Sequence, residues 1–138
     1  MKGIRKFLAL GALALIAVPM LVGCGPAEVK VSLTSYAITI DKTSVPPGDV
    51  IFHITNDATD QKHEFVIFKT DLAPDKMPKN AENNIDEEGA GVTHIDEKEL
   101  EIGESADLKV KLDAGHYVLV CNMPGHFNQG MFVEFDVK

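Results

Sequence analysis

The sequence contains little of what defines several common protein classes. Its 138 residues include 13 basic and 21 acidic residues, which give a formal net charge of −8. Because no basic patch is present to meet phosphates, nucleic acid is not expected as a partner. After Val22, no stretch repeats apolar residues at the helical period, which argues against a helical bundle. Only two cysteines occur, Cys24 and Cys121, so the chain can form at most one disulfide.

Long hydrophobic runs are also scarce, and the one that exists lies at the N-terminus. Residues 7–18 are apolar or small and follow the basic residues Lys2, Arg5 and Lys6, as in an export signal. The run is shorter than the roughly 20 residues that a membrane span needs. It leads into Leu21-Val22-Gly23-Cys24, which resembles the lipobox of bacterial lipoproteins. We therefore expect residues 1–23 to be a signal peptide and Cys24 to be lipidated. A retained signal anchor and an ordinary cleaved signal are the alternatives.

Cleavage before Cys24 leaves a chain that suits one extracytoplasmic domain on a bacterial membrane. Removing residues 1–23 removes three of the 13 basic residues and no acidic residue, so the net charge becomes −11. Residues 24–27 then form a short tether, and residues 28–138 form the domain. If Cys24 carries lipid, it cannot pair with Cys121. A free thiol in an oxidising compartment is a liability unless something occupies it, and a metal ion would.

The rest of the sequence is dominated by period-two alternation, the pattern of strands with one buried face. Turn residues such as Pro46-Pro47-Gly48 separate the segments. Seven strands separated by short turns predict an all-β protein, a β-sandwich of about seven to eight strands. We expect strands at residues 28–33, 36–40, 49–56, 63–69, 106–112, 116–121 and 131–137.

Residues 70–103 depart from this pattern, because they are rich in acidic residues, Asn, Gly and Pro and have only scattered apolar positions. A connection of this length without regular structure is unusual in a compact domain and is typical of functional or mobile segments. We expect a long acidic loop, with one short helical turn near residues 95–100.

The strongest functional signal is the segment that joins the last two predicted strands. Cys121, His126 and Met131 offer a thiolate, an imidazole and a thioether on one turn. Copper that cycles between Cu(I) and Cu(II) favours two histidines and one cysteine, with a weak axial methionine. Alternation places Cys121 on the same strand face as Leu119, and Met131 on the core face of the next strand. Three of the four ligands of one copper ion are therefore present on this loop.

The fourth ligand must come from elsewhere, and His63 is the best candidate. It begins a predicted strand and shares a face with Phe65. The other three histidines have less suitable positions, and we expect structural or solvent-exposed roles for them: His53, His94 and His116.

These residues together resemble the cupredoxins, the family of plastocyanin, azurin and rusticyanin. The likeness extends over residues 28–138 and rests on His63, Cys121, Pro124-Gly125-His126 and Met131, and the Cys-x4-His-x4-Met spacing resembles that of rusticyanin and the auracyanins. The resemblance implies a Greek-key sandwich with His63, Cys121 and His126 as equatorial ligands and Met131 as the axial ligand.

The resemblance has two departures from the family pattern. Many members have Asn directly after the first histidine, where it ties the two ligand loops together, but this chain has Glu64. Asn122 is then the candidate for this clamp. Met123 is a second thioether, but it lies too close to Cys121 in sequence for ligation and is expected on the surface.

The resemblance further implies a monomeric carrier of single electrons and not an enzyme. Electrons in this family usually pass through the edge of the C-terminal histidine, here His126, with docking at Met123, Pro124 and Phe127. The acidic charge would favour a basic redox partner, such as a cytochrome or an oxidase domain. The alternative is a lipoprotein that captures, stores or delivers copper. Enzymes are disfavoured, because Cys121 and His126 lack a third orienting group and the chain lacks the His-x-His pairs of a second copper site.

Overall fold

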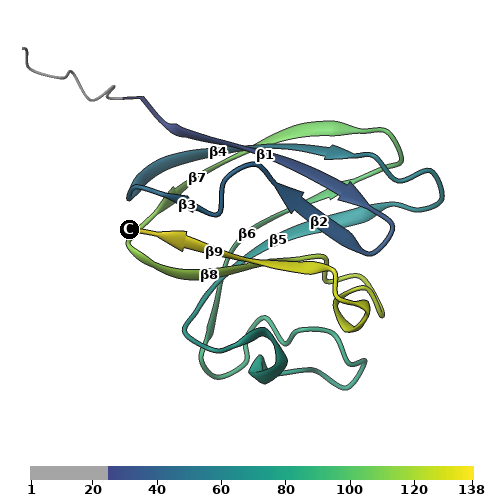
Figure 1. Ribbon diagram of the computed structural model, residues 1–138. Coiled ribbons are helices and arrows are strands. Elements are labelled where there is room, and N and C mark those ends of the chain that lie inside the picture. Colours follow the sequence, from purple (N-terminus) through teal and green to yellow (C-terminus); the bar gives the residue numbers. More distant parts are fainter. Residues whose placement is uncertain (1–24) are drawn as a thin grey trace, which may run out of the picture.

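The computed structural model describes residues 25–138, which form nine strands and two short 3-10 helices (Figure 1). The predicted signal peptide, residues 1–23, and the predicted lipidation site Cys24 lie outside the described residues. None of the helices in the described part is both long and apolar enough to cross a membrane. The elements are β1 (Ala27–Thr34), β2 (Ala37–Ile40), β3 (Ser44–Val45), β4 (Gly48–Asn56), β5 (His63–Thr70), η1 (Pro74–Lys76), β6 (Val92–Leu100), β7 (Ser105–Leu112), β8 (Gly115–Val120), η2 (Phe127–Gln129) and β9 (Phe132–Val137).

The strands form two sheets that pack face to face, as expected of a β-sandwich (Figure 1). One sheet has the order β2-β1-β4-β7, and the other has the order β3-β9-β8-β5-β6. The β1/β4 and β3/β9 pairs are parallel and the other pairs are antiparallel, so both sheets are mixed. The prediction of an all-β sandwich is confirmed.

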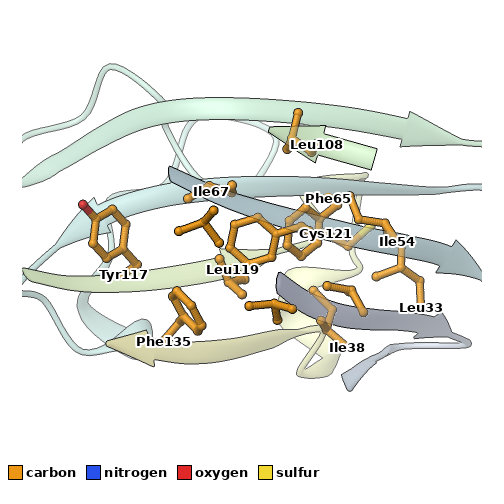
Figure 2. Packing of buried hydrophobic residues seen from close by; sticks show 14 of the residues in the cluster. Leu33, Ile38, Ile54, Phe65, Ile67, Leu108, Tyr117, Leu119, Cys121 and Phe135 are labelled. Carbon is orange, nitrogen blue, oxygen red and sulfur yellow. The ribbon is translucent and has the colours of Figure 1, made fainter. Parts of the chain in front are cut away.

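The main core lies between the two sheets and follows the alternation of the sequence. β1 buries Val29, Val31 and Leu33 and exposes the residues between them, because successive side chains of a strand point to opposite faces. Figure 2 shows side chains of both sheets meeting in this space, with Tyr117 near one end of the cluster and Cys121 in the other half. Tyr117, Leu119 and Cys121 share the inner face, as the sequence predicted.

A second core covers the outer face of the five-stranded sheet. Val66 and Phe68 of β5 and Val118 and Val120 of β8 point outward and pack under the connection that follows β5. Met77 and Ile85 of this connection cover the face, and Phe127 of η2 packs with them. β5 and β8 are therefore buried on both faces, which explains why they read as nearly continuous apolar runs.

The acidic connection is more ordered than the sequence suggested. Its last part is β6, which pairs with β5 along its length, so the helical turn predicted near residues 95–100 is wrong. The reason is a β-bulge: Phe68 pairs with His94 and Ile67 pairs with Asp96, which leaves Ile95 without a partner. This extra residue breaks the alternation that identifies a strand in sequence. The two-residue strand β3 was also missed, because it is too short to show a period.

Candidate metal centre

The four predicted ligands meet at one end of the sandwich because of where the strands begin and end. His63 is the first residue of β5, Cys121 directly follows β8, His126 caps η2, and Met131 directly precedes β9. All four are buried, with His126 the most exposed at 7%. The Cys121 N–H donates to the Met131 carbonyl (3.0 Å), which closes the loop between β8 and β9.

The donor atoms of three ligands converge on one point. Nδ1 of His63 and Nδ1 of His126 are 3.2 Å apart, and Cys121 Sγ lies 3.2 Å from His126 Nδ1 and 3.7 Å from His63 Nδ1. The centre of such a triangle lies about 2 Å from each corner, close to typical metal–nitrogen bond lengths of about 2.0–2.1 Å. Met131 is fully buried in the same cluster as Cys121, so its thioether completes the set. The arrangement is that of a type 1 site for one copper ion.

Burial sets the protonation of these ligands. Desolvation lowers the pKa of His63, and the neighbouring His126 lowers it further. Desolvation also lowers the pKa of His126. Both imidazoles are therefore mostly neutral near pH 7, and the Nδ1 atom of each ring faces the other ring and the Cys121 sulfur. The buried Nε2 of His63 has no hydrogen-bond partner within residues 25–138. Two neutral ring nitrogens facing one another suit a soft cation.

The pKa of the Cys121 thiol shifts in the opposite direction to that of the two histidines. Burial raises the pKa of Cys121, while hydrogen bonds from the backbone of Glu64 and Met123 partly offset the rise. The Glu64 N–H donates to Sγ at 3.3 Å. Metal binding must therefore release the thiol proton, which makes copper uptake weaker as the pH falls. The Glu64 backbone contact also joins the two ligand-bearing segments.

The segment before His63 is held by a fully buried asparagine. Asn56 Nδ2 donates to the carbonyls of Gln61 (3.1 Å) and Leu100 (3.2 Å), and its Oδ1 accepts from the Ala58 N–H (3.0 Å). Both polar atoms of the Asn56 side chain are thus hydrogen-bonded. These bonds fix the turn between β4 and β5, and therefore the position of His63.

Asn122 does not form the clamp that the sequence suggested. Its Oδ1 accepts from the Ile85 N–H (2.8 Å), and its Nδ2 donates to the Ile85 carbonyl (3.1 Å) and to Glu87 Oε1 (3.0 Å). It therefore ties the Cys121 segment to the acidic connection and not to the His63 segment. The reason is direction: Cys121 points into the main core, so its neighbour Asn122 points to the opposite face of the sheet.

Glu64 lies on this same outer face, beside other carboxylates. Desolvation raises its pKa to about 7, with further contributions from Glu97, Glu87 and Glu99. The side chain that follows the first ligand is thus a weak acid and not an amide donor. Close to neutral pH it is partly protonated.

The surface over His126 differs in one residue from the predicted docking patch. Pro124 is exposed and Met123 is half-buried, but Phe127 is 5% exposed and packs against Phe132 in the second core. Phe127 is therefore no surface contact, because the η2 turn directs it under the acidic connection. Tyr36 takes the place of Phe127 on the surface over His126. It is 37% exposed, and its ring packs edge to face on the His126 ring, with 5.3 Å between the ring centres.

Sequence reasoning missed Tyr36 because it treated this residue as the start of a strand. Tyr36 is the second residue of the two-residue turn between β1 and β2, and it adopts a left-handed conformation (φ 63°). Such backbone strain in a bulky residue is uncommon and marks positions worth attention. The signal available in the sequence was an aromatic residue at the centre of a hairpin.

Two of the three remaining histidines lie between carboxylates away from the metal centre. His53 contacts Asp107 (2.7 Å) and Glu28 (3.7 Å), and His116 contacts Asp136 (3.0 Å) and Glu134 (3.5 Å). Both are partly exposed, in agreement with the predicted structural or solvated roles. His94 lies on β6, on the outer face of the five-stranded sheet.

Comparison with known proteins agrees with this geometry. The family model of the sulfocyanin (SoxE) domain matches residues 32–138. A reduced auracyanin from Roseiflexus castenholzii has 23% identity and a TM-score of 0.59, over 83% of this chain and 99% of that chain. Auracyanin A of Chloroflexus aurantiacus has 22% identity and a TM-score of 0.57, over 83% and 100%. Among curated protein sequences there is no match.

The same fold also occurs in a larger copper enzyme. A copper-containing nitrite reductase from Thermus scotoductus has 10% identity and a TM-score of 0.54, over 83% of this chain and 31% of that one. At these identities the structures establish the fold. Joined with the family match and the converging ligands, they support a copper-binding protein of the electron-transfer type in general. The chain belongs to the sulfocyanin (SoxE) domain family of cupredoxin-type copper proteins.

Proposed function

We propose that this protein carries single electrons between extracytoplasmic redox partners by means of one copper ion that alternates between Cu(I) and Cu(II). The observation that carries the proposal is the preformed ligand set. Three donor atoms already lie within 3.2–3.7 Å of one another, on segments fixed by strands and buried hydrogen bonds. A site that changes little between oxidation states transfers electrons with little reorganisation.

The same burial disfavours the two alternatives. A copper enzyme needs an open coordination position for its substrate, whereas these four ligands are 0–7% exposed. A protein that delivers copper must release it readily, and a site enclosed on several sides by core residues opposes rapid release. Rapid exchange of bound copper with added chelator, on the timescale of mixing, would favour copper delivery instead.

Docking would take place over His126. Tyr36, Met123 and Pro124 form a small apolar surface beside its ring, which suits brief association more than tight binding. Acidic residues of the connection between β5 and β6 surround the neighbouring face, including the exposed Glu82 and Glu88. Charge of this sign would steer a basic partner, such as a cytochrome or an oxidase domain, towards the site of electron exit.

A lipid anchor at Cys24 would hold this surface away from the membrane. β1 begins at Ala27, only three residues after the proposed lipidated residue, and runs to the hairpin that carries Tyr36. Eight residues of strand span about 26 Å at about 3.3 Å per residue. β1 begins at the end of the sandwich opposite the loop between β8 and β9 (Figure 1), so an anchor three residues before Ala27 would lie away from the copper site. Cell-made protein should partition with membranes, and Cys24→Ser should release it or block its processing.

The steering proposal is tested by the rate of electron transfer between the reduced protein and a basic cytochrome, measured by stopped flow at several salt concentrations. Neutralising Glu82 and Glu88 together should lower the rate at low salt and flatten its salt dependence, since screening acts over about 10 Å at 0.1 M salt. A matched variant neutralises two exposed carboxylates at the opposite end of the sandwich, Asp49 and Asp113. Equal effects of the two pairs would contradict docking at the copper end.

A further inference from the structure

A second group of metal-binding side chains lies on the outer face of the five-stranded sheet. It depends on the β-bulge in β6. In a regular strand, residues three apart face opposite ways, but the unpaired Ile95 reverses the alternation. His94 pairs with Phe68 and Glu97 pairs with Val66, and these two partners both face the second core. His94 and Glu97 therefore lie on one face.

The connection that follows β5 adds a third donor to this face. Glu87 is held there by Asn122, whose Nδ2 donates to Glu87 Oε1 at 3.0 Å. One ligand atom each from Glu87, His94 and Glu97 lies within 4.8 Å of the others, and His94 Nε2 is 3.3 Å from Glu97 Oε2. A hydrogen bond from a neighbouring amide that orients a carboxylate is typical of metal sites.

His94 is also placed differently from the other two surface histidines. In His53 and His116, each ring nitrogen faces its own carboxylate, so the two acids lie on opposite sides of the ring. At His94, by contrast, both carboxylates approach the same donor atom. Its Nε2 is shielded from solvent and makes no hydrogen bond of good geometry with any residue from 25 to 138, and the ring packs on Phe68 with 5.7 Å between the ring centres.

The surroundings carry unbalanced negative charge and leave space. Glu64 reaches the same face, and Glu97 and Glu87 both act on it as like charges. An open surface pocket of about 410 Å³ adjoins the cluster on the side of Glu87 and is lined by Glu64, Glu87 and Asn122, among others. A divalent cation would relieve the repulsion among the carboxylates.

We propose that Glu87, His94 and Glu97 form a second metal site, which takes one borderline divalent transition-metal ion of the Zn²⁺ or Cu²⁺ class. One imidazole nitrogen and two carboxylate oxygens, with remaining positions open to water, suit such ions better than Ca²⁺ or Mg²⁺. The site is separate from the copper centre but adjoins it through Asn122, the neighbour of Cys121, and through Glu64, whose N–H contacts the thiolate sulfur. Added positive charge here disfavours Cu(II) relative to Cu(I), so the ion raises the reduction potential of the copper.

The test is calorimetric titration of the copper-loaded protein with Zn²⁺, because the type 1 ligands are then already occupied. The wild type should bind one Zn²⁺, and His94→Gln should weaken binding by about tenfold or more, as expected for loss of a ligand. His53→Gln is the matched control: it too removes a partly exposed histidine with two neighbouring carboxylates, and it should leave the affinity for Zn²⁺ unchanged. Retention of the type 1 absorption shows that each variant is folded.

A second pair of variants separates coordination from general attraction by negative charge. Glu97→Gln removes a donor, whereas Glu101→Gln removes an equal charge from the exposed turn after β6. The proposal expects a large loss of affinity in the first variant alone, and a Zn²⁺-induced rise in reduction potential in the wild type that His94→Gln abolishes. If His94→Gln and His53→Gln lose equal Zn²⁺ affinity, the proposal is overturned. It is also overturned if Glu97→Gln and Glu101→Gln lose equal Zn²⁺ affinity. Since binding is read as heat, the result stands whether or not the copper carries electrons.

Discussion

Replacement of Glu64 by glutamine probes the electrostatics beside the copper centre. Burial, followed by repulsion from Glu97, Glu87 and Glu99, raises the pKa of Glu64 from 4.5 to about 7 in the folded protein. Between these values the folded state still holds a proton that the unfolded chain has lost, and above pH 7 the folded state must carry an unfavourable charge. Glu64 therefore destabilises the fold increasingly as the pH rises from about 4.5 through about 7, and its effect vanishes below that window.

The size of the effect follows from the shift. A change of about 2.5 pH units at about 1.4 kcal/mol per unit sets an upper limit of about 3 kcal/mol. Glu64 is only half-buried, so water screens part of the charge, and we expect about 1–2 kcal/mol. Glutamine keeps the shape and cannot ionise. Glu64→Gln should thus stabilise the protein at about pH 8 by this amount more than at about pH 4.5.

The assay is urea unfolding of copper-free protein at both pH values, with the free energy of unfolding obtained by linear extrapolation. Copper is omitted because its charge would itself act on Glu64. The exposed Glu82 provides the control for loss of a surface carboxylate, and Glu82→Gln should leave the free energy of unfolding nearly unchanged. If Glu64→Gln changes stability equally at both pH values, the carboxylate does not carry the destabilising charge.

Changes at three further residues test other parts of the structure. Asn122→Ala should lower the free energy of unfolding by about 1–3 kcal/mol, because it leaves the Ile85 backbone groups without partners; a smaller loss in urea unfolding would mean that water replaces them. Tyr36→Asn should relieve about 1 kcal/mol of left-handed strain and leave stability equal or higher, yet slow electron transfer to a cytochrome; an unchanged rate would remove Tyr36 from the docking surface. Met131→Leu should raise the reduction potential and Met131→Gln should lower it, as voltammetry would show; no change in either would mean that Met131 is not axial.

The ligands could be predicted from sequence because local spacing and strand alternation determine where they lie. Cys121, His126 and Met131 lie on one short loop, and alternation alone places Cys121 and Met131 on inner faces. His63 required only that its strand begin at the same end of the sandwich. These features depend on periods of two and on short turns, which a sequence shows directly.

The arrangement on the outer face of the five-stranded sheet was not predictable in the same way. A single extra residue, Ile95, concealed β6, and the second core rests on two isolated apolar residues, Met77 and Ile85, in an otherwise polar segment. Their burial depends on tertiary packing, which no local period reports. Likewise, the direction of Phe127 is set by one turn of η2 and not by its position next to His126.

The central claim is that His63, Cys121, His126 and Met131 hold one copper ion through a thiolate bond, and a visible spectrum tests it most directly. On addition of Cu(II), the purified domain should develop an intense blue or green thiolate-to-copper band with one equivalent of copper. Cys121→Ala should abolish the band, whereas His53→Gln, a change far from the ligands, should retain it. A colourless copper complex of the unmutated protein would contradict the account.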